Sequence, residues 1–331
     1  MKPKKTHLSS ILKHCVAIAI ICFLSLYLIK HWHALKSLSN FTFPKIALMY
    51  AITLAASFIA GLAAKILLSS LDTKVKLRDM ILLYNTVSLL NYIPFKFGTL
   101  FRANYLKKHN NLKFAHFGTF FIYQILIMTF TISVLGSIIL LSICNIHTWS
   151  VQILLAIFIM ASIISFIFLF IHIPFLPHKN KLAHIINNFL KGRNNIIKNK
   201  KIIFVYAFLM NINFILGALR LSLIYESLGQ NAHPAGFLIL GAAGYLTMFI
   251  SLTPGSLGIR EIVLGSTSEV IGIPIRIGIP AALFDRLIAI TFSFVIGGIC
   301  TIILWNKNPK DFKRIKSTTE ENDNNIVMDF L

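Results

Sequence analysis

Charged side chains interrupt several stretches of the sequence that are otherwise apolar, and cations outnumber acids among them by six to three. A charge at the centre of a bilayer costs at least about 2.5–3.5 kcal/mol on insertion scales, so it is normally paired or placed in a polar cavity. The guanidinium of arginine stays charged under burial, and its planar fork matches the oxygens of a phosphate. These residue types therefore predict recognition of an anionic group within apolar surroundings. The residues concerned are Lys65, Lys96, Arg102, Arg220, Arg260, Glu261, Glu269, Asp285 and Arg286.

Opposite charges stand next to each other twice in this set, as Arg260-Glu261 and as Asp285-Arg286. Neighbouring residues of a helix point about 100° apart, so they do not pair with each other. We therefore expect the pairs to form across the two segments, Glu261 with Arg286 and Arg260 with Asp285. Such pairs have two interpretations, which the sequence leaves open: a purely structural salt-bridge network, or a polar cavity for an anionic headgroup.

The composition identifies the class of protein. Of the 331 residues, 56% are hydrophobic and 13% are charged, whereas a soluble domain carries about 25% charged residues. The net charge of +21 would suggest nucleic-acid binding in a soluble protein, but the sequence has no RNP, zinc-finger or helix-turn-helix signature. Cytoplasmic loops of membrane proteins accumulate Lys and Arg, which accounts for the charge. We therefore expect an all-α polytopic membrane protein that binds no nucleic acid.

Apolar segments long enough to cross a bilayer predict about six full spans. Two further apolar segments are broken by proline and glycine, which remove a helical hydrogen-bond donor and loosen the backbone. Such breaks persist at membrane depth only where they are buried in protein or line a wet cavity. The full spans are expected at 11–30, 46–70, 115–143, 151–173, 202–226 and 277–305, and the broken segments at 80–106 and 235–273.

The two broken segments share a motif, Pro-x-x-x-Gly followed by an arginine. The first contains Asn91, Pro94 and Gly98 before Arg102, and the second contains Pro254, Gly255 and Gly258 before Arg260. Broken helices that meet near the membrane centre are typical of transporters built from inverted repeats. The shared motif therefore predicts two equivalent re-entrant breaks.

The distribution of basic residues predicts that both termini are cytoplasmic, provided that both broken segments are re-entrant. The basic start of the chain is followed by an apolar run and by His31-Trp32-His33, a poor context for signal cleavage, so we expect an uncleaved first helix. Each half then contains two spans, a re-entrant hairpin and a third span. We expect one integral membrane domain over 1–331, with inverted halves at about 10–143 and 151–305 and a short polar cytoplasmic tail at 306–331.

At these residues the sequence resembles the lysylphosphatidylglycerol synthase transmembrane-region family, also called flippase-like membrane proteins. The closest match is Thr253 to Glu261, and the stretch from Asn91 to Leu106 and Arg286 also fit. The resemblance implies a lipid-handling domain in the inner (plasma) membrane, with flipping of modified phospholipids as the activity. The chain ends at Leu331, so the aminoacyl-transfer domain of larger members is not expected. Tyr123-Gln124 stands where the family tends to have an acid–arginine pair.

The predicted headgroup site combines the charges of the two breaks and the last span. Arg102, Arg260 and Arg286 are expected to bind the anion, and Glu261 and Asp285 to hold the arginines. Ser256 would cap the helix after the second break, whose free N–H groups also suit phosphate. No catalytic residues, metal site or cofactor are expected, because the sequence has no Walker A, GxSxG or HExxH motif and no paired cysteines.

We therefore expect an integral membrane lipid transporter, not an enzyme, that moves or binds an anionic phospholipid or a polyprenyl-phosphate lipid. An alternative is a non-transporting partner that recruits a cell-envelope biosynthesis enzyme through its basic cytoplasmic face, from Lys179 to Lys201. A membrane-embedded transferase ranks last, because no base and nucleophile pair is evident. The identity of the lipid, the direction and driving force of movement, and the oligomeric state do not follow from the sequence.

Overall fold

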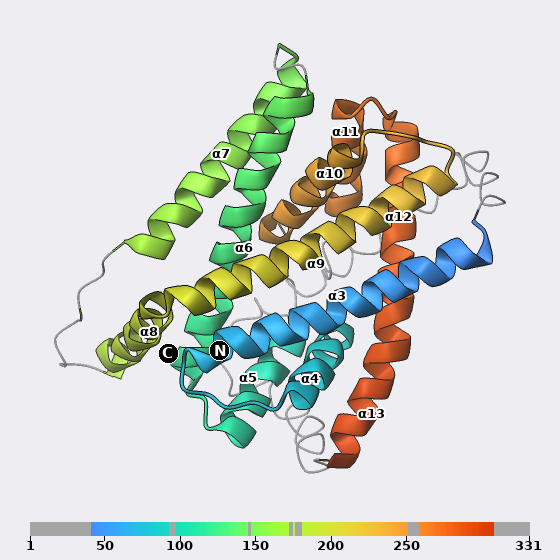
Figure 1. Cartoon of the computed structure of the whole chain (residues 1–331). Coiled ribbons are helices and arrows are strands. Elements are labelled where there is room, and N and C mark those ends of the chain that lie inside the picture. The colour runs from blue at the N-terminus through green and yellow to red at the C-terminus, as the bar shows by residue number, and fades with distance from the viewer. Residues whose placement is uncertain are drawn as a thin grey trace, which may run out of the picture.

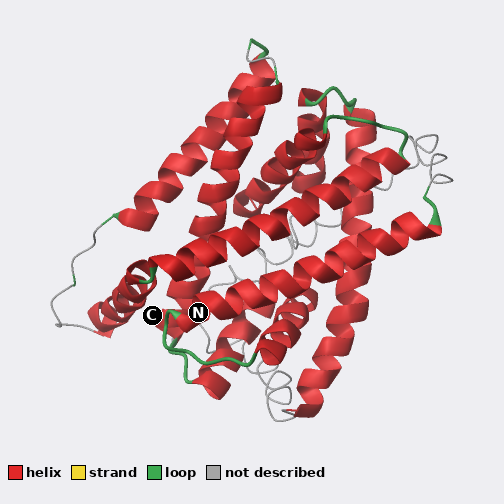
Figure 2. Ribbon diagram, viewed as in Figure 1, coloured by secondary structure: helices red, strands yellow, loops and turns green. Residues whose placement is uncertain are grey.

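The computed structural model describes residues 41–92, 97–144, 147–171, 175, 181–250 and 258–307. Within these residues every regular element is helical (Figures 1 and 2). The predicted first span at 11–30, the prolines Pro94 and Pro254, and Gly255 and Ser256 lie outside the described residues. The tail beyond Lys307 does so too.

Five helical segments of the described chain are long and apolar enough to cross a membrane. They correspond to the expected spans other than the first, and their bounds differ from the predicted ones by a few residues. At a rise of 1.5 Å per residue, the 27 residues of α3 extend about 40 Å, which exceeds the roughly 30 Å hydrocarbon core. The segments are α3 (Phe43–Ser69), α6 (Phe114–Ile143), α7 (Trp149–Phe170), α9 (Lys200–Ser227) and the continuous run Ile275–Lys307.

The α7 helix shows that the protein's outer surface suits lipid rather than water. Its buried residues are few, and large apolar side chains such as Met160, Phe168 and Phe170 are more than half exposed. A water-soluble monomer rarely exposes so large a contiguous apolar surface. The protein is therefore a multi-pass membrane protein.

The helices α3 and α9 pack side by side and run in opposite directions (Figure 1). The buried face of α3 contains mainly small residues, including Ser57, Ala60, Gly61 and Ala64. Lipid gives no hydrophobic drive for helices to associate, so small residues that allow close packing are favoured at helix contacts. At Gly61 the close neighbour is Ile81 of α4 (Leu77–Leu90). One polar contact joins α9 to α3, a hydrogen bond of 2.5 Å from the Asn213 side chain to the Ala56 carbonyl.

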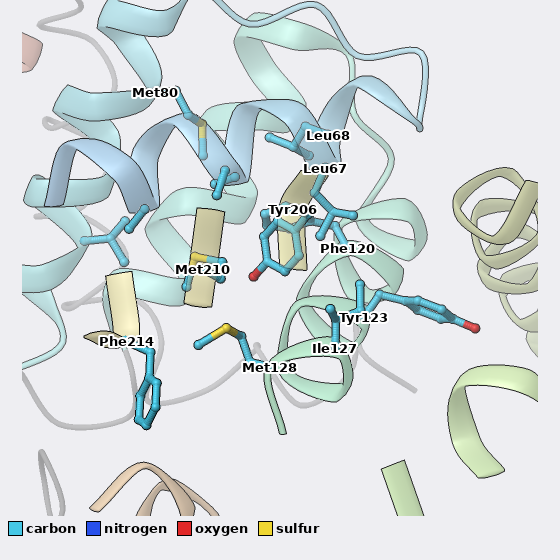
Figure 3. Packing of buried hydrophobic residues seen from close by; sticks show 14 of the residues in the cluster. Leu67, Leu68, Met80, Phe120, Tyr123, Ile127, Met128, Tyr206, Met210 and Phe214 are labelled. Atoms are coloured by element: carbon cyan, nitrogen blue, oxygen red, sulfur yellow. The ribbon is translucent and has the colours of Figure 1, made fainter. Parts of the chain in front are cut away.

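The larger of the two buried clusters lies where α3, α6 and α9 meet α4. Figure 3 shows Tyr206 of α9 between Leu67 of α3 and Met210, with Phe120 of α6 beside it. Tyr123 points away from this group, and its hydroxyl donates a hydrogen bond of 3.3 Å to the Leu169 carbonyl of α7. These contacts fix α6 between α9 and α7.

Both broken segments are pairs of short helices. The first pair is α4 and α5 (Phe97–Asn110), and the second is α10 (Pro234–Leu246) and α11 (Ile259–Val270), with a 3-10 turn at Thr247–Ile250 after α10. None of these helices exceeds 14 residues, so each extends at most about 21 Å, less than the thickness of the hydrocarbon core. Within each pair the two helices pack against each other. The described part of each broken segment therefore contains no continuous spanning helix.

The glycine of the shared motif has a different physical role in each break. A Cβ on Gly98 would lie 2.4 Å from the Val87 carbonyl oxygen and 2.6 Å from Oδ1 of Asn91, so only glycine lets α5 start this close to the end of α4. Gly258 instead has a φ of +87°, which other residues adopt at a cost. It occupies the N-cap position of α11, which corrects the prediction that Ser256 would cap this helix.

The last span is not a uniform α-helix. A π-helical turn at Ser293–Gly297 separates α12 (Ile275–Phe292) from α13 (Gly298–Lys307). At this turn Gly297 packs against the backbone of Asn85, and the hydroxyls of Ser88 and Ser293 are 2.9 Å apart. The turn therefore holds the last span against α4.

The basic region from Lys179 to Lys201, for which no helix was predicted, contains a helix, α8 (Lys181–Lys198), which packs on α6 and α9. Its apolar side buries Leu190 and Ile196, and Lys191 and Lys198 are exposed. The guanidinium of Arg193 is buried and donates a hydrogen bond to the carbonyl of Ile171 at the end of α7. A cation there interacts favourably with the C-terminal helix dipole, which anchors α8 to α7.

Candidate functional site

A cavity of about 590 Å³ lies among the broken helices and the spans. Its described lining comes from both breaks, through residues such as Asn91, Thr99 and Thr247, and from the spans α6, α9 and α12. Among the residues that the structure describes, four charged side chains border it: Arg102, Arg220, Arg260 and Asp285. A charged cavity inside an apolar bundle is a functional-site candidate on physical grounds.

Asp285 of α12 is the centre of the charged group. It is fully buried, and Arg220 of α9 contacts its Oδ1 through Nε at 2.8 Å and through Nη2 at 2.7 Å. Arg260 of α11 contacts the other oxygen, Oδ2, at 2.8 Å through Nη2. One carboxylate is therefore shared by two guanidinium groups from two different helices.

The backbone packing of α11 and α12 positions this group. A Cβ on Gly278 would lie 2.2 Å from the Ser268 hydroxyl oxygen and 2.8 Å from the Cα of Gly265, so the two helices meet almost backbone to backbone. Asp285 lies two turns further along the same buried face of α12, which also contains Ala281. This close crossing brings Arg260 of α11 within reach of Asp285.

Arg220 has a second fixed partner. Its Nη1 donates a hydrogen bond of 3.0 Å to the hydroxyl of Thr53, a buried residue of α3. Three donor groups of one guanidinium are thus engaged by α3 and α12, and the side chain is rigidly oriented. Arg260 is less enclosed, with 28% of its side chain exposed against 14% for Arg220. Arg260 is therefore the arginine of this pair with more freedom to bind a ligand.

Glu261 and Arg286 form a separate buried pair. Glu261 is fully buried, and its Oε1 accepts a hydrogen bond from Nη1 of Arg286. Its Oε2 accepts a hydrogen bond of 2.7 Å from the N–H of Gly258, at the start of α11. A carboxylate at this position also suits the helix dipole. The pair connects the start of α11 to the last span, and neither residue is among those that line the cavity.

Arg102 of α5 has a different environment. Only 5% of the residue is exposed, and its Nε and Nη2 have no hydrogen-bond partner among the described residues. Its guanidinium carbon lies 4.7 Å from the ring centroid of Phe120. A desolvated cation–π contact contributes about 2 kcal/mol, whereas burying an ion costs several kcal/mol even after relaxation, roughly 3–5 when its partner is absent. The aromatic ring therefore offsets only part of the cost.

The charges of the cavity do not balance. Its described lining contains three arginines and one carboxylate, a net charge of +2. The rest of this lining combines neutral polar groups such as Gln124 and Asn213 with apolar side chains such as Ile125, Met128 and Phe214. A surface of this kind suits a molecule with an anionic end and an apolar end.

The structure contains both ion pairs that the sequence predicted, Arg260 with Asp285 and Glu261 with Arg286. It brings together Arg102, Arg260 and Asp285 at one cavity, and places Arg286 behind it with Glu261. The sequence analysis noted Arg220 as an intramembrane charge but gave it no place in the site. The signal was its position late in an apolar span, which is the same signal that selected the other residues.

Within the described chain, no group of three or more His, Cys, Asp or Glu side chains could hold a metal ion. The two described cysteines, Cys144 and Cys300, are free thiols. The arrangement at the cavity provides charge and hydrogen-bond donors for an anion.

Comparison with known proteins identifies one family. The family described as "Lysylphosphatidylglycerol synthase TM region" matches residues 11–297, most of the chain. No curated protein and no solved structure matches the chain.

Proposed function

This chain belongs to the lysylphosphatidylglycerol synthase transmembrane-region family, and from this premise we propose that it is a flippase-like lipid transporter. The cargo is an anionic phospholipid or a polyprenyl-phosphate lipid, and the protein carries out no chemical reaction on it. The observation that carries the proposal is the cavity with a net charge of +2 among its described lining residues, inside a bundle of apolar helices. A ligand with an anionic headgroup would compensate this charge within the membrane.

The packing of the helices supports an inverted repeat. In the first half α4 packs against α3 and α5, and in the second half α10 packs against α9 and α11. Each pair also reaches across to the other half: α4 contacts the last span, and α10 contacts α6. The equivalent spans α3 and α9 run antiparallel (Figure 1), as inverted repeats require. Residues that flank the first break and residues that flank the second line the same cavity, which fits a site between the two repeats.

The orientation proposed for the chain places it in the inner membrane with both termini in the cytoplasm. The exposed lysines of α8 and the basic end of α5, with Lys107 and Lys108, then lie on the cytoplasmic side. Positive residues on that side agree with the rule that sets membrane-protein orientation. The start of α7, with the exposed Ser150, lies outside.

A second function is favoured by the α8 helix. It presents Lys191 and Lys198 to the surface beside Lys200, at the start of α9. A basic helix of this kind fits an acidic patch of a cell-envelope biosynthesis enzyme. In that case the protein recruits the enzyme to the membrane and does not itself transport lipid.

Lipid transport by the purified protein in vesicles tests the proposal. The vesicles contain a fluorescent phosphatidylglycerol, and a reductant outside them bleaches the label as it reaches the outer leaflet. The wild-type protein should accelerate transfer between the leaflets, and Arg260→Gln should abolish the acceleration. The variant should still fold, because Arg220 keeps Asp285 paired.

The matched control is Arg276→Gln, which removes the same charge at an exposed position outside the cavity lining. It should transport as the wild type does. If the wild-type protein is inactive with both phosphatidylglycerol and phosphatidic acid, transport is excluded for these lipids and the recruiting function is favoured. The recruiting function predicts that substitution of Lys191 and Lys198 by Gln abolishes membrane recruitment of the partner enzyme.

A further inference from the structure

From the balance of charges in the cavity we propose that the cargo lipid carries two negative charges on its headgroup, as a phosphomonoester or a diphosphate does. The inference rests on the proposed function and specifies the class of lipid within it. A phosphodiester lipid such as phosphatidylglycerol carries one negative charge and would leave the site positive.

The first step concerns the pair Arg220 and Arg260. Both contact Asp285, so two positive charges share one negative charge. One further negative charge is needed to neutralise this end of the cavity. A phosphate oxygen placed at Arg260, the more exposed of the two arginines, would supply it, and a guanidinium is suited to such oxygens.

The second step concerns Arg102, which lines the same cavity from α5. Only 5% of Arg102 is exposed, and no carboxylate among the described residues forms an ion pair with it. Its Nε and Nη2 are also without a hydrogen-bond partner there. A second negative charge on the ligand would give this buried cation the counter-ion that the described protein does not provide.

The third step distinguishes a lipid from a free phosphate ion. Most of the remaining lining is apolar, and it includes Val87, Ile132 and Leu221. An ion alone would leave these side chains without contact, whereas an acyl or prenyl chain would pack against them. The ligand is therefore an amphiphile whose headgroup ends in a dianionic phosphate.

Binding to the purified full-length protein in detergent tests this. The probes are short-chain phosphatidic acid, short-chain phosphatidylglycerol and inorganic phosphate, and each Kd is obtained from the increase in Tm with ligand concentration. Phosphatidic acid should bind at least about tenfold more tightly than phosphatidylglycerol, the ratio that one additional charge-assisted hydrogen bond provides. Inorganic phosphate should bind more weakly than either lipid.

Two variants locate the effect. Arg102→Gln should lower the affinity for phosphatidic acid to that for phosphatidylglycerol, and should leave the latter unchanged. Gln124→Glu adds a carboxylate to the lining of the same cavity and should reduce the preference in the same way. Arg276→Gln should change neither Kd. The empty Arg102→Gln protein should have a Tm at or above that of the wild type, because the variant removes a buried cation without an ion-pair partner.

Each other result has a definite meaning. Equal Kd values for the two lipids, or a preference that survives both cavity variants, overturn the dianionic headgroup but leave lipid transport standing. Inorganic phosphate that binds as tightly as phosphatidic acid overturns the amphiphilic ligand. Binding of neither lipid overturns this inference and the proposed lipid site together. If Arg102→Gln does not fold, Gln124→Glu alone decides between these results.

Discussion

Arg220 of α9 contacts a single oxygen of Asp285, through a hydrogen bond from its Nε and an ion-pair contact from its Nη2, which leaves the second oxygen of that carboxylate to Arg260. The removal of either arginine therefore leaves Asp285 with a partner. The removal of Asp285 leaves two partly buried cations with none of the ion pairs that they form in the wild type. The two kinds of substitution should consequently differ in their effect on the fold.

We expect Asp285→Asn to lower the stability of the empty protein by about 3–5 kcal/mol, the cost of breaking a buried ion pair by removing one partner. An anionic lipid should restore part of this loss, because the ligand replaces the missing carboxylate. Thermal unfolding in detergent, with and without phosphatidic acid, measures both effects. The matched control is Glu226→Gln, which breaks the exposed 2.9 Å pair with Lys45 and should cost at most about 1 kcal/mol. Equal losses for the two variants would refute the central role of Asp285.

Glu261 and Arg286 should behave as a structural pair. We expect Glu261→Gln and Arg286→Gln each to destabilise the protein by about 3–5 kcal/mol, because each leaves the other residue buried without its ion pair. The double variant should cost less than the sum, with a coupling of roughly 1–3 kcal/mol. A double-mutant cycle on Tm measures it. Additive losses would show that the two residues do not act together.

Gly98 should tolerate no side chain. In Gly98→Ala the new Cβ would overlap the Val87 carbonyl oxygen, so the start of α5 has to move away from α4. We expect a loss of about 1–3 kcal/mol, as for other overpacked sites. Gly298→Ala is the control, since no atom lies within 4 Å of its Cβ and the residue is helical. This control should stabilise the protein by up to about 1 kcal/mol, and a similar gain in Gly98→Ala would contradict the close approach.

The proposed orientation predicts which surfaces are accessible from each side. In a variant without native cysteines, a cysteine at Ser150 should react with a membrane-impermeant maleimide added to intact cells. A cysteine at Lys191 should react only after the membrane is permeabilised. Both positions are exposed, so burial does not account for a lack of reaction. External labelling at Lys191 would reverse the topology.

The sequence predicted most of the long helices, because a span leaves a strong signal: about 20 apolar residues without charge. It also predicted the partners of Glu261 and Arg260, because the helical repeat excludes pairing between neighbours and few other intramembrane charges are available. The positions of Asn91 and Gly98 were predicted to break a helix, and the structure has α4 end at Leu90 and α5 begin at Phe97.

Other features depend on contacts that have no local signal. Arg220 is 65 residues from Asp285, and only the crossing of α9 and α12 brings the two together. The π-helical turn at Ser293–Gly297 has no sequence motif, and it depends on packing against α4. No helix was predicted at α8, because the analysis considered only its basic residues. Its apolar residues nevertheless follow the i, i+3, i+4, i+7, i+8 spacing of a helical face: Leu182, Ile185, Ile186, Phe189 and Leu190.

The shared carboxylate of Asp285 has a consequence for the speed of the proposed transport cycle. An anionic headgroup that reaches Arg260 shares this arginine with an anion that is already there, so it gains less free energy from the contact than it would from an arginine without an acidic partner. Asp285 thus acts as an internal competitor for the cargo. It keeps the affinity for the cargo low, and a weakly bound cargo dissociates quickly. A carrier needs this fast turnover, whereas a storage protein would gain from the opposite, a site with no acid of its own.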